Sequence, residues 1–217
     1  DLLVVATPDA LYLVEPCSFT ATRLESLDRT TRLSPVELTG AGEKLDNGSA
    51  AVIQELLDRA AVLVASDLVG IARKALTETV EYDKTRVQFG KPIGSFQAIK
   101  HDLADLHVAV TMAEHAATYA AFAIDTDRED KTLAVSIAKS KAADTARKAT
   151  SDMIQYHGGI GYTWEHDAHF YFKRAKRLEY AYGDAAQHRE RIAALLIDQA
   201  GEQGHLRTDG SEMAVST

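Results

Sequence analysis

The residues most able to do chemistry fall in a few short segments of this 217-residue chain. The first segment, residues 86–99, brings a cation, two aromatic rings and an amide together. A planar guanidinium such as that of Arg86 can meet a diphosphate through two parallel hydrogen bonds. Phe89 and Phe96 offer flat apolar faces to a ring, and Gln97 offers a polar contact. Because a cation and a glycine also mark an ordinary helix end, the spacing leaves both interpretations open.

The second segment, residues 155–166, places three glycines shortly after Gln155. Their spacing superficially matches a dinucleotide-binding fingerprint, but that fingerprint follows a strand and opens a helix. Here the glycines end a predicted helix, so we exclude that interpretation. They either supply positive φ for a turn or also let the backbone come close to a ligand, with the amide of Gln155 beside it.

Two further groups of polar residues are interpreted as surface features. His166 and His169 stand three apart beside two acids, but no third and fourth ligands cluster with them, so we expect no metal site. A basic set on the third predicted helix is interpreted as a solvated face, with contact to ligand phosphates or to a partner as the alternative. Its members are Lys139, Lys141, Arg147 and Lys148.

Helices must position these segments. The cap signal at residues 47–49 predicts a first helix to about Asp83, and Ser95 is interpreted as the cap of a second helix. Apolar residues recur along that second helix at spacings of three and four only, as a bundle seam requires, from Phe96 to Ile124. The same kinds of signal predict the remaining elements: helices at 129–155, 166–175 and 184–199, and strands at 2–6, 10–14, 19–23 and 36–38.

The sequence therefore predicts an α+β fold, mainly α, in which a partial β domain at 1–46 precedes an antiparallel four-helix bundle at 47–200. Three or four strands are too few to close a barrel. We expect them to be half of a larger β domain or a sheet edge completed by another chain, with a small self-sufficient sheet as the alternative. The polar residues 201–217 show no periodicity and are predicted to be disordered.

Composition excludes several classes of protein. The 24 Lys and Arg residues against 32 Asp and Glu residues give a formal charge of −8, which does not favour nucleic acid or an anionic membrane. Cys17 is the only cysteine, so no intrachain disulfide can form and a reducing cytoplasm is expected. The longest apolar run, residues 60–66, is far shorter than the roughly 20 residues of a membrane-spanning helix. Asp1, followed at once by apolar residues, predicts a strand entered partway through a domain rather than a signal peptide.

The chain resembles the C-terminal half of an acyl-CoA dehydrogenase over about residues 1–199. The most specific parts of the resemblance are R-x-Q-F-G-K-P-I-x-x-F-Q-A-I at 86–99 and Q-x-H-G-G-x-G-Y-T-W-E-H at 155–166. The stretch at 27–32 and the opening strands are similar to the middle β domain of that family. The resemblance implies a helical bundle domain that follows part of this β domain.

The resemblance also implies a cofactor and a reaction. In this family FAD lies extended at a subunit interface, a carboxylate base removes the α-proton of an acyl-CoA thioester, and the β-carbon gives a hydride to the flavin. Electron-transferring flavoprotein is the implied acceptor. The matching positions place Arg86 on the pyrophosphate and the other candidate residues along the cofactor, namely Phe89, Phe96, Gln97, Gln155 and Gly159.

The catalytic base is where this sequence departs from the family. The usual glutamate position after the basic segment at 174–177 is Tyr182, and the alternative position on the first long helix is Ala60. A tyrosine is a poor base at neutral pH because its ordinary pKa is near 10. Glu179 and Asp184 are close in sequence, but on a continuous helix Glu179 would lie almost a full turn before Tyr182, so we expect neither acid to be the base.

Cofactor residues without a base suggest a shared active site. The family includes heteromeric α2β2 dehydrogenases in actinobacteria, several of which act in steroid side-chain breakdown. We therefore expect this chain to complete the FAD site of a related subunit that supplies the glutamate for an acyl-CoA substrate. Two alternatives stay open: a non-catalytic oligomerisation module derived from the bundle, and a homo-oligomeric dehydrogenase with a displaced base.

Overall fold

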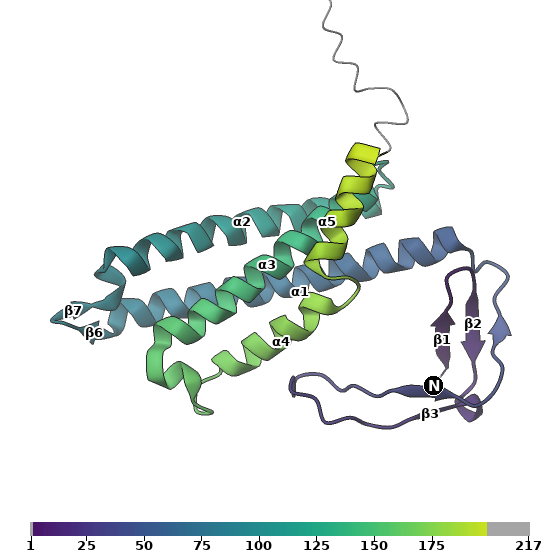
Figure 1. The fold of residues 1–217 in the computed structure, drawn as a ribbon, viewed down its shortest axis with the longest axis horizontal. Coiled ribbons are helices and arrows are strands. Elements are labelled where there is room, and N and C mark those ends of the chain that lie inside the picture. Colours follow the sequence, from purple (N-terminus) through teal and green to yellow (C-terminus); the bar gives the residue numbers. More distant parts are fainter. Residues whose placement is uncertain (1, 199–217) are drawn as a thin grey trace, which may run out of the picture.

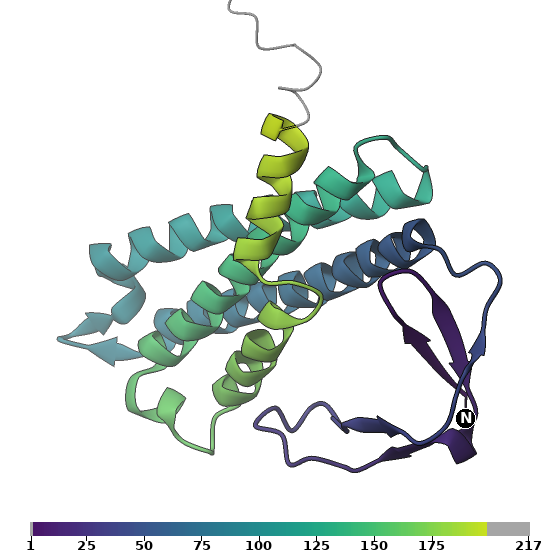
Figure 2. The ribbon, with the colours of Figure 1, turned by 45° about the vertical axis from the view of Figure 1, so that its right-hand side comes forward.

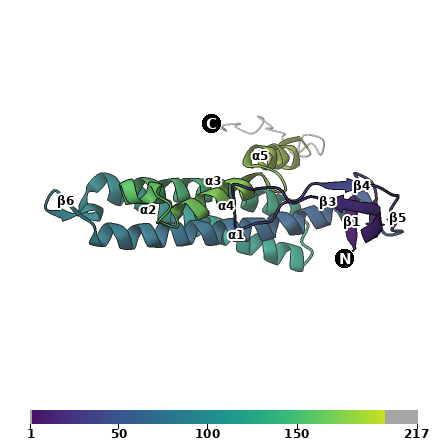
Figure 3. The ribbon, with the colours of Figure 1, turned by 90° about the horizontal axis from the view of Figure 1, so that it is seen from below.

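The computed structural model describes residues 2–198, so the predicted end of the last helix at 199 and the predicted disorder of 201–217 lie outside the described residues. The described chain is a long helical bundle with short β strands before it (Figure 1). Figure 3 shows these strands at one end of the bundle and a small hairpin at the other. The predicted fold class, mainly α with a preceding β part, is confirmed. No helix within residues 2–198 is long and apolar enough to cross a membrane.

The β part consists of two small antiparallel sheets. The first has the order β1-β2-β5 and pairs Leu3 with Val14, and the second pairs Phe19 of β3 with Leu38 of β4. The strands are short: β1 Leu3–Ala6, β2 Leu11–Val14, β3 Phe19–Ala21, β4 Val36–Leu38 and β5 Glu43–Lys44. Much apolar surface stays exposed on these strands and at Leu2 just before β1, including Val4, Val36 and Leu38.

The bundle is built from three long helices that run antiparallel to their chain neighbours, followed by two shorter helices (Figure 1). The helices are α1 Ala50–Thr85, α2 Gln97–Asp125, α3 Lys131–His157, α4 Ala168–Tyr180 and α5 Ala185–Ala193, the last continued by a π-helical turn at Ala194–Asp198. A hairpin of β6 Val87–Gln88 and β7 Lys91–Pro92, with a 3-10 turn at Ile93–Ser95, joins α1 to α2. A second 3-10 turn at Gly158–Tyr162 follows α3.

Helix α3 lies at the centre of the bundle because its buried faces are lined with small side chains. It packs against α1, α2, α4 and α5 (Figure 2). Alanines recur on its buried surface at intervals of three, four and one, which lets neighbouring backbones come close: Ala134, Ala138, Ala142, Ala143, Ala146 and Ala149. Larger side chains such as Leu68 of α1 and Leu106 of α2 fill the remaining space and are fully buried.

The start of α1 agrees with the sequence prediction, but the start of α2 does not, because a 3-10 turn precedes that helix. Ser49 caps α1 as predicted, since its Oγ accepts the N–H of Val52 at 3.4 Å. Ser95 does not cap α2, so that prediction was wrong. Its hydroxyl donates to the carbonyl oxygen of Pro92 at 2.7 Å inside the 3-10 turn, and Phe96 is the N-cap residue without a side-chain cap.

The loop between β3 and β4 is tied to the bundle by ion pairs. The buried carboxylate of Asp28 accepts a hydrogen bond from the Arg177 guanidinium at 2.7 Å. Arg174 of α4 donates to Asp67 of α1 at 2.5 Å and to the hydroxyl of Thr30 at 3.0 Å. Residues 28 and 30 are therefore fixed against α4, and the loop reaches across to this helix in Figure 2.

Candidate functional site

The two segments with candidate cofactor residues lie at the same end of the bundle. The C-terminal ends of α1 and α3 and the N-terminal end of α2 meet there (Figure 1). The Tyr82 ring stacks on the His157 ring with centroids 4.3 Å apart, and the Tyr82 hydroxyl donates to the His157 carbonyl oxygen at 3.4 Å. Tyr82 stands four residues before Arg86 and His157 two residues after Gln155, so this contact joins the two segments.

The β6–β7 hairpin displays an aromatic pair outside the bundle. Its two-residue loop, Phe89 and Gly90, has φ angles of 53° and 78°, the positive pair that a tight hairpin turn requires. Phe89 is 92% exposed, and its ring meets the Phe96 ring edge-on with centroids 6.2 Å apart. The ammonium of Lys91 lies 4.4 Å from the Phe96 ring centroid. An exposed phenylalanine in this backbone conformation is a costly choice for folding alone and suits contact with another molecule.

Arg86 has a fixed backbone and an exposed side chain. Its N–H donates to the Tyr82 carbonyl oxygen at 2.8 Å, and its own carbonyl oxygen accepts the N–H of Ile93 at 2.8 Å. Within residues 2–198 no carboxylate lies within ion-pair distance of its guanidinium. Gln97, at the start of α2, is also exposed, and its Nε2 lies 3.5 Å from His101 Nε2. The guanidinium of Arg86 is therefore available to an anion from outside the bundle.

The glycines after α3 have separate physical roles. Gly158 ends the helix with a φ of 62° and donates its N–H to the carbonyl oxygen of Gln155. A Cβ on Gly161 would lie 2.7 Å from the Ile154 carbonyl oxygen, so packing in this chain requires glycine there. A Cβ on Gly159 would meet nothing within 4 Å. Packing in this chain therefore does not explain Gly159, whereas the close approach of a ligand would.

A polar network fixes the helix that carries Gln155. The Tyr156 hydroxyl donates to Asp102 of α2 at 2.5 Å, and the Lys148 ammonium donates to Asp102 at 2.9 Å and to Asp152 at 2.8 Å. The hydrogen bonds from Tyr156 and Lys148 lower the pKa of the Asp102 carboxyl. Because these contacts join α2 to α3, they hold the two cofactor segments in a constant relation.

One of the two positions of the family's base, Tyr182, lines a cavity, and the other, Ala60, does not. The cavity has a volume of about 380 Å³, and its lining includes Tyr182 and Ala61, the residue next to Ala60. Its lining contains no carboxylate. Asp58 lies two residues before Ala60, but it is 3% exposed and its carboxylate pairs with Arg191 at 2.8 Å.

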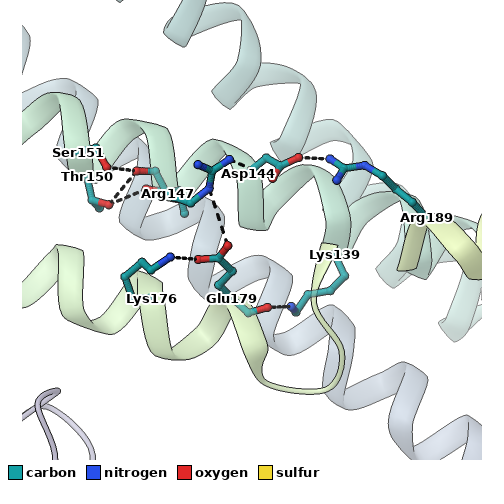
Figure 4. A network of polar contacts seen from close by, with 9 residues as sticks. Lys139, Asp144, Arg147, Thr150, Ser151, Lys176, Glu179 and Arg189 are labelled. Atoms are coloured by element: carbon teal, nitrogen blue, oxygen red, sulfur yellow. Dashed lines mark hydrogen bonds and ion pairs between the residues drawn. The ribbon is translucent and has the colours of Figure 1, made fainter. Parts of the chain in front are cut away.

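The two acids near Tyr182 are already engaged. The carboxylate of Glu179 pairs with Lys176 at 2.7 Å and with Arg147 at 3.7 Å, as Figure 4 shows. Asp184 caps α5, because its Oδ1 accepts the N–H of Gln187 at 2.8 Å. Helix α4 ends at Tyr180, so the assumption of one continuous helix from Glu179 to Tyr182 was wrong. The conclusion that neither acid is placed as a free base rests instead on these pairings.

Lys139 corrects the predicted solvated face of α3. Its side chain is fully buried, and its ammonium donates to the carbonyl oxygen of Glu179 at 3.0 Å, as Figure 4 shows. The same ammonium donates to the carbonyl oxygen of Gly183 at 2.8 Å. Burial lowers the pKa of Lys139 to about 8. The other three members of the set, Lys141, Arg147 and Lys148, are exposed. A residue predicted to face solvent therefore holds the turn that carries Tyr182.

The backbone of that turn is strained and held from a second side. Tyr182 has a φ of 56° and Gly183 a φ of 96°. Nε2 of the buried His188 lies 3.0 Å from the Tyr182 carbonyl oxygen. Because a carbonyl oxygen only accepts, Nε2 carries the proton in this contact. Lys139 and His188 together fix the position of Tyr182 at the cavity.

The histidines considered as metal ligands make other contacts. Nδ1 of His166 accepts the N–H of Ala168 at 3.1 Å, and the His169 ring packs edge-on against Trp164 at 4.7 Å between centroids. Across residues 2–198, no group of three or more His, Cys, Asp or Glu side chains is arranged to hold a metal ion.

Comparison with known protein families identifies the family of this chain. A family model described as the acyl-CoA dehydrogenase C-terminal domain matches residues 47–197. The chain belongs to the acyl-CoA dehydrogenase family. The resemblance found in the two cofactor segments is thereby confirmed at the level of the family.

Two curated acyl-CoA dehydrogenases show how much of a relative the chain spans. IpdE2 of Mycolicibacterium smegmatis is 38% identical over 194 residues, which make up 89% of this chain and 58% of that protein. FadE34 of Mycobacterium tuberculosis is 38% identical over 213 residues, or 98% of this chain and 28% of that protein. The chain thus spans about a quarter to three fifths of these relatives.

Solved acyl-CoA dehydrogenase structures share the fold. The Tcur3481–Tcur3483 steroid ACAD matches with a TM-score of 0.82 and 28% identity, over 92% of this chain and 55% of that chain. The ChsE4–ChsE5 complex from Mycobacterium tuberculosis matches with a TM-score of 0.76 and 30% identity, over 86% of this chain and 52% of that chain. Both neighbours are assemblies of two named components.

Proposed function

We propose that this chain is a subunit of a flavin-dependent acyl-CoA dehydrogenase, contributing FAD contacts across a subunit interface while a related subunit supplies the catalytic glutamate. One pair of observations carries the proposal. The candidate cofactor side chains are presented at one end of the bundle, and the cavity at Tyr182 is lined without a carboxylate. A bundle that presents cofactor side chains at one end but no carboxylate in the cavity at Tyr182 fits an active site shared between subunits.

The residues at the bundle end fit a dinucleotide that lies against the outside of the chain. FAD, when bound, supplies the hydride acceptor for desaturation of the acyl chain. The Arg86 guanidinium would neutralise the pyrophosphate, and Phe89 with Phe96 would cover apolar parts of the cofactor. The open space at the Cβ position of Gly159 and the nearby amide of Gln155 would accept its opposite stretch. These contacts bind and orient the cofactor and move no proton.

The proposed partner is a related dehydrogenase subunit in an α2β2 assembly, with a homo-oligomer as the alternative. The two-component composition of the ChsE4–ChsE5 and Tcur3481–Tcur3483 neighbours supports a heteromeric partner. The steroid ACAD among these neighbours supports an acyl-CoA with a steroid side chain, and a fatty acyl-CoA is the other candidate. Electron-transferring flavoprotein would accept the electrons. In this assembly residues 1–46 would belong to a middle β domain and residues 47–200 to the bundle domain.

The test is retention of flavin by the assembly purified with its companion subunit. Arg86→Gln removes the charge that meets the pyrophosphate, so we expect flavin absorbance per subunit to fall by at least about tenfold at limiting FAD. Lys84→Gln, two residues earlier on an exposed part of α1, is the matched control and should retain flavin. Full flavin retention by Arg86→Gln would contradict the proposal and favour a non-catalytic oligomerisation module.

The homo-oligomeric alternative with a displaced base has a direct test. Glu179 is the acid nearest to Tyr182 before the turn, and its carboxylate is paired with two cations. Glu179→Gln should therefore leave turnover of the complete assembly within about twofold, since a removed general base costs 100-fold or more. A 100-fold loss of turnover would instead show that this chain supplies the catalytic base.

A further inference from the structure

A cavity with no role in the proposed function lies between α1 and the loop that precedes α4. Its volume is about 510 Å³. Its lining consists of Lys74, Thr77, Glu78 and Glu81 on α1, His157 at the end of α3, and residues 165–167 of the loop. The cavity is therefore at the end of the bundle where the two cofactor segments meet.

The lining of this cavity is acidic. Its four carboxylates are those of Glu78, Glu81, Glu165 and Asp167. Glu78 pairs with Lys74 at 2.6 Å, and Glu81 pairs with Lys84 at 2.6 Å. Within residues 2–198, neither Glu165 nor Asp167 has a cation within ion-pair distance, and the Asp167 side chain does not cap α4. Two carboxylates of the cavity are therefore available to a cation from outside the chain.

His157 adds a buried hydrogen-bond acceptor to these carboxylates. The residue is 4% exposed, and burial lowers its pKa, so the ring is neutral at neutral pH. Its Nδ1 lies 2.7 Å from the carbonyl oxygen of Met153. Because a carbonyl oxygen only accepts, Nδ1 carries the proton and Nε2 keeps a lone pair. In the part of the chain that the structure describes, Nε2 has no hydrogen-bond partner. A buried acceptor without a donor is uncommon and indicates a donor supplied by another molecule.

Aromatic contacts fix the His157 ring at the cavity. The Tyr82 ring stacks on it at 4.3 Å between centroids with 23° between the planes, and the His166 ring lies 4.3 Å away with a tilt of 52°. A guanidinium matches this arrangement, because its planar fork donates to several acceptors at once and packs against aromatic rings. A metal ion does not match it, since no group of three His, Cys, Asp or Glu side chains in residues 2–198 is arranged to hold one.

We propose that this cavity receives an arginine side chain of the companion subunit, whose guanidinium donates to Nε2 of His157 and pairs with Glu165 and Asp167. The acidic lining complements a cationic side chain in sign. The contact between Tyr82 and His157 joins the two cofactor segments, so a subunit that shares the cofactor lies beside this cavity. The proposal rests on the proposed function for the identity of this partner.

The test is the Kd of the assembly between this chain and its companion subunit, measured by analytical ultracentrifugation with FAD in excess. The double variant Glu165→Gln/Asp167→Asn changes two exposed carboxylates, so it should fold normally and raise the Kd by at least about tenfold. The matched control Asp125→Asn/Glu129→Gln removes two exposed carboxylates at the turn between α2 and α3, at the opposite end of the bundle, and should leave the Kd unchanged. Equal Kd values for the two double variants would overturn the proposal, as would isolation of the chain without any companion.

Salt and a competing cation provide two further readouts. The Kd of the wild-type assembly should rise more steeply with ionic strength than that of Glu165→Gln/Asp167→Asn, because salt screens ion pairs. Agmatine carries a guanidinium on a short chain. Compared with sodium chloride at equal ionic strength, it should raise the Kd of the wild-type assembly and leave that of the variant unchanged. Binding of agmatine to the chain without any effect on assembly would assign the cavity to a free cation and overturn the arginine of the companion.

Failure of this proposal is distinct from failure of the cofactor contact. At protein concentrations well above the Kd, Glu165→Gln/Asp167→Asn should retain flavin, whereas Arg86→Gln should lose it. Equal Kd values for the two double variants, together with flavin loss by Arg86→Gln, would overturn the cavity proposal alone. A raised Kd for Glu165→Gln/Asp167→Asn, together with full flavin retention by Arg86→Gln, would overturn the cofactor contact alone.

Discussion

The ammonium of Lys139 donates to the carbonyl oxygen of Gly183 at 2.8 Å inside the bundle, and a second bond from the same ammonium reaches the carbonyl oxygen of Glu179 at 3.0 Å. Two backbone acceptors at the end of α4 are therefore satisfied by one buried cation from α3. The strained turn at Tyr182 depends on this contact across forty-four residues of sequence.

Removal of the Lys139 ammonium should destabilise the chain. Lys139→Met keeps an apolar stem of similar length but leaves both carbonyl oxygens without a donor. Each unsatisfied buried acceptor costs about 1–3 kcal/mol, so we expect the free energy of unfolding in urea to fall by about 2–4 kcal/mol. Lys141→Met, at an exposed position of α3, should change it by less than about 0.5 kcal/mol. Equal effects of the two substitutions would disprove the role given to Lys139.

Asp83 should make stability depend on pH. Its carboxyl is 1% exposed, neither oxygen has a hydrogen-bond partner in residues 2–198, and burial raises its pKa to about 6. The folded chain then holds the proton to a higher pH than the unfolded chain, whose aspartates titrate near 4. The contribution of Asp83 to stability is present below pH 4 and is lost as the pH rises through 6.

The neutral variant Asp83→Asn tests this dependence. At pH 8 the free energy of unfolding of this variant should exceed that of the wild type by up to about 2–3 kcal/mol. At pH 4 the difference should vanish. Asp105→Asn, at an exposed position of α2, should show no such dependence. Destabilisation by Asp83→Asn at pH 8 would mean that the carboxylate is ionised and partnered.

The Asp28–Arg177 pair should hold the β3–β4 loop on α4. Burial would raise the pKa of the Asp28 carboxyl, but hydrogen bonds from Thr30 and Arg177 outweigh it and lower the pKa. Arg177→Leu leaves the buried Asp28 carboxylate without its cation. The free energy of unfolding, measured in urea at pH 7, should fall by about 3 kcal/mol. Since the folded pKa is depressed, this cost should shrink as the pH falls below about 4. A double variant with Asp28→Asn that is no more stable than Arg177→Leu alone would count against the pair.

Two glycines two residues apart in the same segment should behave differently when replaced. Gly159→Ala adds a Cβ that meets nothing within 4 Å, so the free energy of unfolding should change by no more than about 0.5 kcal/mol. Gly161→Ala places a Cβ 2.7 Å from the Ile154 carbonyl oxygen and should cost about 1–3 kcal/mol. In the assembly, Gly159→Ala should lower flavin retention despite its normal stability. Normal retention would remove Gly159 from the cofactor surface.

The sequence predicted most of the helices because their apolar spacing is local. The seam of α2 from Leu103 to Ile124 is buried as expected. Ser95 was misassigned because a serine hydroxyl serves a 3-10 turn as readily as a helix cap, and the β6–β7 hairpin before it carries Phe89 where glycine or asparagine is usual. The amphipathic pattern alone does not distinguish a helix that starts at a serine cap from one that follows a hairpin and a 3-10 turn.

Within the candidate site, residue types were predictable but partners were not. Arg86 and Gln155 were identified from motifs, and their shared location follows from the antiparallel order of the helices. Lys139 was assigned to solvent because lysine is rarely buried. Its acceptors are backbone carbonyl oxygens forty or more residues away. Because every residue has such an oxygen, the residue types in the sequence do not indicate these partners. The runs of alanine on both sides of Lys139 were the available indication that it faces the core.

The central claim is that this chain completes a flavin site with a base supplied by another subunit. Native mass spectrometry of the protein isolated with its companions measures subunit stoichiometry and bound FAD together. We expect an assembly of this chain with a second dehydrogenase chain that carries FAD, while the chain alone carries none and does not oxidise an acyl-CoA. Stoichiometric FAD and acyl-CoA oxidation by the purified chain alone would contradict the claim.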